Sequence, residues 1–196
     1  MATARVPGPL LQAIGAVTSW LRDADVPGAI IGGVAASLLA RPRVTKDVDL
    51  VVALPDDELP RFLALGKHYG ITPRTADAVD FAKVSRVLLL RHEPSGIEID
   101  LSLASLPFER EVIERAVERT IRGVAFRVAT AEDLIVMKAI ALRPRDVADI
   151  EALLDTHPHL DLERVRAFLQ AFTEALETDD FAGEFERVLA RQRRRK

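Results

Sequence analysis

The sequence predicts an α/β fold, with a small mixed sheet and flanking helices over residues 1–105 and a mostly helical half over residues 106–196. The apolar run 29–31 ends at two glycines, and a short helical stretch and a basic loop then lead to the β-branched run 48–52. Two further apolar runs, 86–91 and 96–103, flank a Pro-Ser-Gly turn and indicate a hairpin. Thr130 as an N-cap and Pro144 as a helix breaker introduce the helices of the second half.

Composition narrows the class of protein. The 196 residues and 21.6 kDa suit one domain, or one domain with a modest extension. Hydrophobic residues make up 48% of the chain, enough for a sizeable core. The absence of cysteine excludes disulfides and any thiolate metal site or nucleophile. A net charge of −3 argues against nucleic-acid binding through bulk charge, although a local basic patch stays open.

Membrane and export signals are not found in this sequence. No apolar run reaches 18 residues, and the first residues lack the long apolar stretch of a signal peptide. We therefore expect a cytoplasmic protein with no membrane partner.

The first half is expected to alternate helices and strands. Apolar spacing predicts a first helix that Asp25-Val26-Pro27-Gly28 ends, and an acidic start predicts another that Gly70 stops. The expected helices are 10–21, 34–39, 56–68 and 77–85, and the expected strands are 29–31, 48–52, 86–91 and 96–103.

The second half is expected to be mostly helical. A small hairpin over 120–128, turning at Arg122-Gly123, interrupts the helices. The expected helices are 107–119, 130–141, 144–154, 162–176 and 181–189, followed by a frayed basic tail over 191–196.

One stretch combines a glycine turn with a pair of carboxylates. Gly32 and Gly33 allow a sharp turn and leave no side chain where a ligand must approach, and the helix that follows offers free N–H groups to a phosphate. Asp47 and Asp49, two residues apart at the start of a strand, point to the same face. Two adjacent anions favour a cation between them, and Mg²⁺ commonly bridges carboxylates to substrate phosphates.

This stretch resembles the DNA-polymerase-β-like nucleotidyltransferase superfamily. The residues that carry the resemblance are Gly32, Gly33, Arg43, Thr45, Asp47 and Asp49. That superfamily usually has a third carboxylate on a neighbouring strand, and Asp100 in Gly96-Ile97-Glu98-Ile99-Asp100-Leu101 is the match. The resemblance implies a polymerase-β-like core whose metal ligands are Asp47, Asp49 and Asp100.

The helical half narrows the resemblance. Glu132-Asp133-Leu134 with Lys138, followed by Arg145-Asp146 and Asp149-Ile150, is similar to the AbiEii/MenT nucleotidyltransferase toxins of bacterial toxin–antitoxin systems. Together the matches span about residues 30 to 150. The short gap between Lys138 and Asp146 leaves Asp146 and Asp149 competing for one role, and the basic end of the chain has no place in the pattern.

The resemblance implies an enzyme that transfers a nucleotide from ATP, CTP or another nucleoside triphosphate and releases pyrophosphate. Mg²⁺ on Asp47 and Asp49 holds the triphosphate, and Asp100 acts near the attacking hydroxyl as a ligand or a base. Lys138 contacts the triphosphate, Asp146 orients it, and the helical half completes the active-site cleft. The remaining nucleotide contacts are Gly32, Gly33, Ser37, Arg43, Thr45, Lys46 and Asp149. The implied acceptor is the 3′ end of tRNA, whose modification blocks aminoacylation and translation, and a cognate antitoxin restrains the enzyme.

Each residue also has a structural interpretation. The glycine pair alone is more often a turn, Asp100 could be a solvated strand residue, and the loop charges Arg43 and Lys46 could be solvated. Lys138 could be a helix lysine reaching solvent; in either case we expect it to leave by the helix's one free face, so that its removal changes stability by only about 1 kcal/mol. All four histidines are expected to be structural or solvated.

Two rival functions stay open. A small-molecule nucleotidyltransferase of the aminoglycoside-modifying kind would need an open pocket lined by acids. A catalytically silent fold could serve as a binding partner, although three converging carboxylates argue against an idle site.

Overall fold

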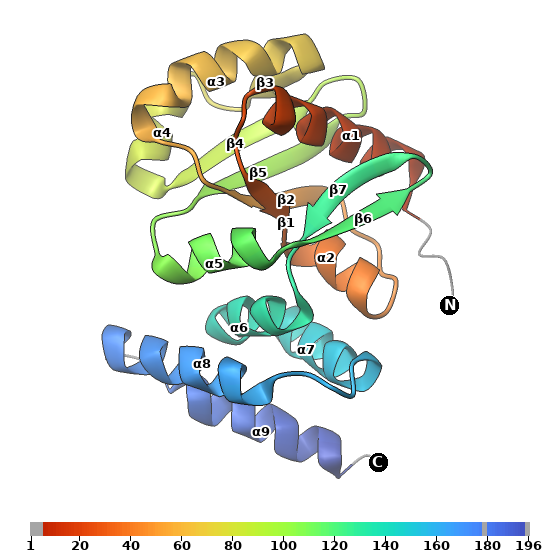
Figure 1. The fold of residues 1–196 in the computed structure, drawn as a ribbon, viewed down its shortest axis with the longest axis vertical. Helices are drawn as coiled ribbons and strands as arrows, with labels where there is room; N and C mark the ends of the chain where they lie inside the picture. The colour runs from red at the N-terminus through yellow and green to blue at the C-terminus, as the bar shows by residue number, and fades with distance from the viewer. Residues whose placement is uncertain (1–5, 178–179, 195–196) are drawn as a thin grey trace. The chain divides into compact units, whose positions relative to one another are not determined.

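The computed structural model describes residues 6–177 and 180–194, and the chain divides into two compact units (Figure 1). The α/β unit comprises Met1–Ala35 and Arg43–Ala129, and the helical unit comprises Ala36–Pro42 and Thr130–Lys196. This division differs from the expected boundary at residue 105, because the chain after that point still pairs with the sheet.

The α/β unit is built on one seven-stranded sheet with the order β3-β4-β5-β2-β1-β7-β6. β2 pairs in parallel with β5, and β1 in parallel with β7, while the other neighbours are antiparallel. The sheet is therefore mixed, as expected. Its strands are β1 (Gly28–Ile30), β2 (Asp47–Val52), β3 (Ile71–Pro73), β4 (Val87–His92), β5 (Ile97–Leu103), β6 (Val117–Ile121) and β7 (Val124–Val128).

Helices flank this sheet, and two of them pack on each other through aromatic rings. Trp20 of α1 stacks on Phe62 of α3 with centroids 3.9 Å apart, and its indole N–H donates to the carbonyl of Phe62. Gly66 leaves room for the same indole ring. The helices of this unit are α1 (Gly8–Asp23), the 3₁₀ turn η1 (Asp56–Glu58), α3 (Leu59–Gly66), η2 (Lys67–Tyr69), α4 (Ala78–Ser85) and α5 (Pro107–Arg115).

The core strand of the sheet carries both apolar and acidic residues. In β2, Val48, Leu50 and Val52 are buried, whereas Asp47 is exposed and Asp49 is half-buried. The alternation turns the two aspartates to one face of the strand. α2 (Gly32–Leu39) begins directly after β1, one strand away from these aspartates.

The helical unit contains α6 (Ala131–Ala141), α7 (Pro144–Thr156), α8 (Leu162–Leu176) and α9 (Phe181–Arg193). Thr130 caps α6 by accepting from the backbone N–H of Asp133. Asp155 of α7 accepts hydrogen bonds from Arg41 and Gln192, so it ties segments distant in sequence together within this unit.

The α/β fold with a mixed sheet is confirmed, and most expected elements lie where they were predicted. Three differ. The three-residue strand β3 was missed, the helix expected over 56–68 is broken into η1, α3 and η2, and the helix expected over 107–119 ends at Arg115. The last correction has a clear cause, because Val117 to Arg119 pair with β7. Part of the expected basic tail lies outside the described residues, and α9 continues into it as far as Arg193. Among the helices described, none is long and apolar enough to cross a membrane.

Candidate active site

The glycine turn lets a carboxylate lie against the start of α2. Gly32 has φ +62°, and a Cβ built on it would overlap the carboxylate of Asp49. The backbone N–H of Gly33 donates to Asp49 Oδ2 at 3.4 Å. Asp49 thus faces the helix N-terminus, where an anion is favoured.

The basic loop after α2 folds back over the second glycine. A Cβ on Gly33 would come within 2.8 Å of both Arg43 Nη2 and Thr45 Cγ2. The structure therefore brings these two predicted residues to the glycine turn. Lys46 is exposed beside Asp47, and Ser37 lies in the second half of α2, which belongs to the helical unit.

Two parallel strands place the acidic residues in a row. In the register of β2 and β5, Asp49 lies opposite Asp100 and Asp47 lies opposite Glu98. Residues paired across neighbouring strands share a face, so four carboxylates project from one side of the sheet. Glu98 was not among the predicted site residues.

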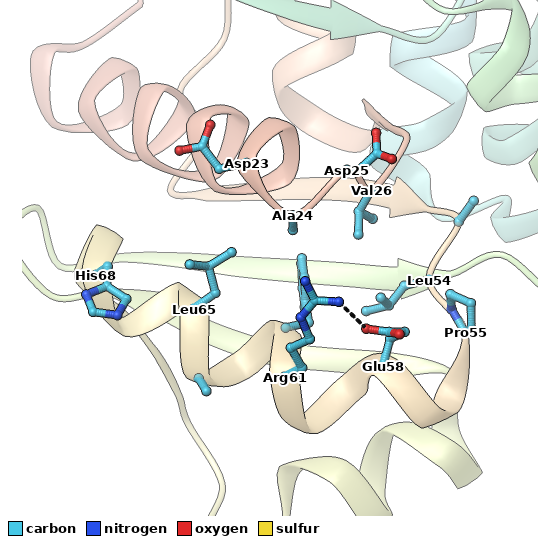
Figure 2. Close-up of a pocket in the computed structure, with 13 residues that line it drawn as sticks. Asp23, Ala24, Asp25, Val26, Leu54, Pro55, Glu58, Arg61, Leu65 and His68 are labelled. Atoms are coloured by element: carbon cyan, nitrogen blue, oxygen red, sulfur yellow. Dashed lines mark hydrogen bonds and ion pairs between the residues drawn. The ribbon is translucent and has the colours of Figure 1, made fainter.

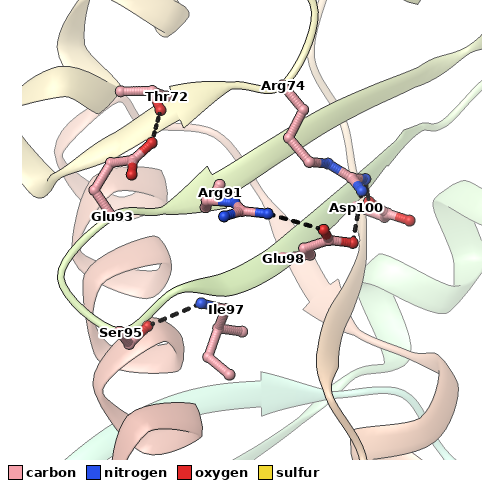
Figure 3. Close-up of polar contacts among 8 residues, drawn as sticks. All are labelled: Thr72, Arg74, Arg91, Glu93, Ser95, Ile97, Glu98 and Asp100. Carbon is pink, nitrogen blue, oxygen red and sulfur yellow. Dashed lines mark hydrogen bonds and ion pairs between the residues drawn. The ribbon is translucent and has the colours of Figure 1, made fainter.

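Arginines from the neighbouring strands neutralise part of this charge (Figure 3). Arg74, just after β3, forms an ion pair with Asp100 and donates to Glu98 Oε2 at 2.7 Å. Arg91 of β4 pairs with the other oxygen of Glu98 at 3.2 Å. Burial raises the pKa of Asp100, the charge of Arg74 lowers it, and the charges of Asp47 and Glu98 raise it, so that the pKa lies above its ordinary value.

The chemistry of these donors fits a divalent cation. Carboxylate oxygens are the ligands that Mg²⁺ prefers, and the guanidinium of Arg74 already lies between Asp100 and Glu98 as a positive stand-in. Over residues 6–177 and 180–194, however, no three His, Cys, Asp or Glu side chains are grouped closely enough to hold a metal ion as they stand. Asp100 is instead paired with Arg74.

The sequence matches the model of a protein family described as "Nucleotidyl transferase of unknown function (DUF2204)" over residues 10–179. The chain belongs to this family. It is therefore a nucleotidyltransferase, as its glycine turn and carboxylates predicted. A search of curated proteins found no match.

Solved structures agree with this nucleotidyltransferase in fold. The solution structure of the antibiotic-resistance factor ANT(2″)-Ia has a TM-score of 0.59 and 17% identity, over 85% of this chain and 92% of that one. The same factor in complex with adenylyl-2″-tobramycin has a TM-score of 0.55 and 17% identity, over 85% and 98% of the two chains. An antigenic nucleotidyltransferase-like protein from Paracoccidioides brasiliensis has a TM-score of 0.53 and 17% identity, over 84% and 88%. At such identities the likeness shows the fold alone.

The helical unit of the nucleotidyltransferase holds the second set of predicted site residues in a buried ion cluster. Lys138 Nζ lies 3.1 Å from Asp146 Oδ1 and 2.7 Å from Asp149 Oδ2, and Lys138 is only 5% exposed. Asp146 and Asp149 therefore both pair with the same lysine.

The burial of Lys138 corrects one expectation. We expected this side chain to leave α6 by a free face, but α6 buries residues on every side, from Ala131 to Ala139. A buried lysine without its partners is costly, so Lys138 matters to the stability of this unit.

Asp146 also holds the start of α7. Its Oδ2 accepts from the backbone N–H of Arg143 at 3.2 Å and from Arg143 Nε at 2.8 Å. Burial alone would raise the pKa of Asp146, but hydrogen bonds from Arg143 and Lys138 and the charges of both outweigh it and lower the pKa. Asp146 is therefore held as a carboxylate.

A cavity lies at the opposite end of β2 from the carboxylates (Figure 2). It has a volume of about 690 Å³ and is lined by residues that include Asp23, Asp25, Glu58 and His68. Its lining also includes Ala53 and Leu54, which follow β2, whereas Asp49 is near the start of that strand. Four residues of strand separate Asp49 from Ala53, or roughly 13 Å. This acidic pocket therefore lies apart from the carboxylates near the start of β2.

Proposed function

We propose that the glycine turn and the β2–β5 carboxylates bind a nucleoside triphosphate together with Mg²⁺. The observation that carries this proposal is the fit of Gly32 to Asp49, since only a residue without a side chain leaves room for that carboxylate at the N-terminus of α2. Asp47 and Asp49 would hold the metal, and Asp100 would join them. A bound Mg²⁺ would neutralise phosphate charge and fix the triphosphate for in-line attack.

The protein's own groups would position the two reactants. The N-terminus of α2, the guanidinium of Arg43 and the side chains of Thr45 and Lys46 would contact the phosphates. The acceptor hydroxyl would attack the α-phosphorus and lose its proton to Asp100, while the bond to the β-phosphate breaks and pyrophosphate leaves. Nucleotidyl transfer of this kind depends on position and charge more than on covalent chemistry.

We propose RNA, and specifically the 3′ end of tRNA, as the acceptor. Support comes from the resemblance of the Lys138, Asp146 and Asp149 segment to the AbiEii/MenT toxins. In this proposal the modified tRNA is no longer aminoacylated, translation stops, and an antitoxin protects the cell. For Ser37, Lys138, Asp146 and Asp149, a direct role at the nucleotide stays a prediction.

A small-molecule acceptor is the second candidate. It is favoured by the fold shared with ANT(2″)-Ia, one structure of which holds an adenylylated tobramycin. The acidic pocket of Figure 2 does not add to this candidate, because its lining includes none of the carboxylates of β2 and β5.

One assay separates the acceptors. The protein would be incubated with each labelled nucleoside triphosphate and Mg²⁺, together with either total tRNA or an aminoglycoside mixture. We expect label on tRNA only, and expect periodate oxidation of the tRNA 3′ end to prevent it. Label on an aminoglycoside with none on RNA would overturn the RNA proposal and favour the second candidate.

A further inference from the structure

Arg74 occupies the place beside the proposed metal ligands where another cation would be expected. Its backbone N–H donates to the carbonyl of Leu89, which fixes the residue beside β4. Its guanidinium then reaches across to β5, where Nη1 binds Glu98 and Nη2 binds Asp100 Oδ1 (Figure 3). The side chain is only 24% exposed, so this is a positioned contact rather than a solvated surface pair.

Asp100 lies opposite Asp49 in the strand register, but its side chain pairs with Arg74. The register sets Asp100 directly opposite Asp49, close enough for both to bind one ion. Even so, no three acidic side chains converge within the described residues, and Asp100 is instead bound to Arg74. Arg74 thus links Asp100 to Glu98.

One hydrogen-bond donor of Arg74 has no acceptor in the described part of the chain. Its Nε–H is buried and has no hydrogen-bond partner among the residues that the structure describes. An unsatisfied buried donor costs free energy, so the observed arrangement is less stable than a fully paired one would be. Another cation that binds Asp100 more strongly can therefore displace the guanidinium of Arg74.

We propose that Arg74 is a built-in counter-cation that occupies Asp100 until a divalent metal ion arrives with the nucleotide. This inference rests on the metal site of the proposed function. A metal ion and a guanidinium on one carboxylate repel each other, so Arg74 weakens metal binding to the empty protein. The charge of the triphosphate reverses that balance, which makes metal binding depend on the nucleotide.

The test measures metal affinity rather than activity. Mn²⁺ binding to the full chain would be followed by electron paramagnetic resonance of the free ion, without nucleotide, for the wild type and three variants. We expect Arg74→Gln to bind Mn²⁺ about tenfold more tightly, since a unit positive charge has been removed beside the site. Arg91→Gln is the matched control, because Arg91 pairs with Glu98 at 3.2 Å but does not contact Asp100. Its affinity should stay within about twofold of the wild type, as for an exposed pair.

The third variant separates this inference from the proposed function. Asp49→Asn should lose Mn²⁺ binding; if it binds as the wild type does, the proposed metal site is wrong. If Asp49→Asn loses binding while Arg74→Gln binds no more tightly than the wild type, Arg74 is not a competing cation and only this inference fails. Thermal melting would check each fold, and Arg74→Met, with the same expected gain, would replace Arg74→Gln if that variant unfolds.

Discussion

At the scale of single residues, Gly32 is the position where one methyl group should have the largest effect on activity. Gly32→Ala would force a left-handed backbone on alanine and push the Asp49 carboxylate aside. We expect a loss of transfer activity of about a hundredfold, because a displacement of about 1 Å can cost that much. Melting and transfer assays on the same preparation would measure both effects.

The matched control for Gly32 is Gly96. It has a similar φ of +69°, but a Cβ there would meet nothing within 4 Å. Gly96→Ala should therefore lose only the strain energy, about 1 kcal/mol of unfolding free energy, and keep its activity. Equal activities for the two variants would show that the fit between Gly32 and Asp49 is not used.

At the scale of elements, the Lys138 cluster is expected to hold α6 and α7 together. Lys138→Ala would leave two buried carboxylates without their lysine, and we expect it to lower the free energy of unfolding by about 3–5 kcal/mol. Lys83→Ala, at an exposed position of α4, should change it by no more than about 0.5 kcal/mol. Urea unfolding of both variants would test this, and a change below about 1 kcal/mol for Lys138→Ala would contradict the buried cluster.

The same cluster predicts a pH dependence. The pKa of Asp146 is lowered in the folded chain, so the folded state binds the proton of Asp146 less tightly than the unfolded state does. Its contribution to stability is therefore full above the unfolded-state pKa of about 3.9 and is lost as the pH falls through the lower folded-state pKa. In urea unfolding between neutral and acid pH, Asp146→Asn should show a shallower loss of stability than the wild type. Parallel curves would argue against a lowered pKa.

Local signals in the sequence were sufficient for most elements and for the glycine turn beside Asp49. Thr130, Pro144 and the Arg122-Gly123 turn each act within a few residues, so their elements could be predicted. β3 could not, because three residues of strand carry little pattern and depend on pairing with β4. Arg74 was missed for a related reason: 26 positions separate it from Asp100, and only the β3–β4–β5 pairing brings them together.

Other site features had a signal that the prediction did not use. Glu98 precedes Asp100 by two residues on the same strand, which is the spacing that singled out Asp47 and Asp49. The burial of Lys138 could also have been predicted, since α6 has apolar residues on all sides and acidic residues follow at Asp146 and Asp149. An ionic partner for that lysine could have been inferred.

At the scale of the whole molecule, the chain has the α/β fold expected from its sequence, belongs to a family of nucleotidyltransferases and carries a proposed metal–nucleotide site. The family is described as one of unknown function, and one fold can host different functions, so neither determines the acceptor. The carboxylates of β2 and β5 are the part on which every version of the proposed reaction depends.

The most direct test of that dependence is the transfer activity of Asp49→Asn in Mg²⁺. The asparagine keeps the shape of the side chain beside Gly33 but removes the charge that would bind the metal. We predict a melting temperature close to that of the wild type and a loss of nucleotide transfer of about a thousandfold. Transfer near the wild-type rate by a folded Asp49→Asn protein would contradict the account.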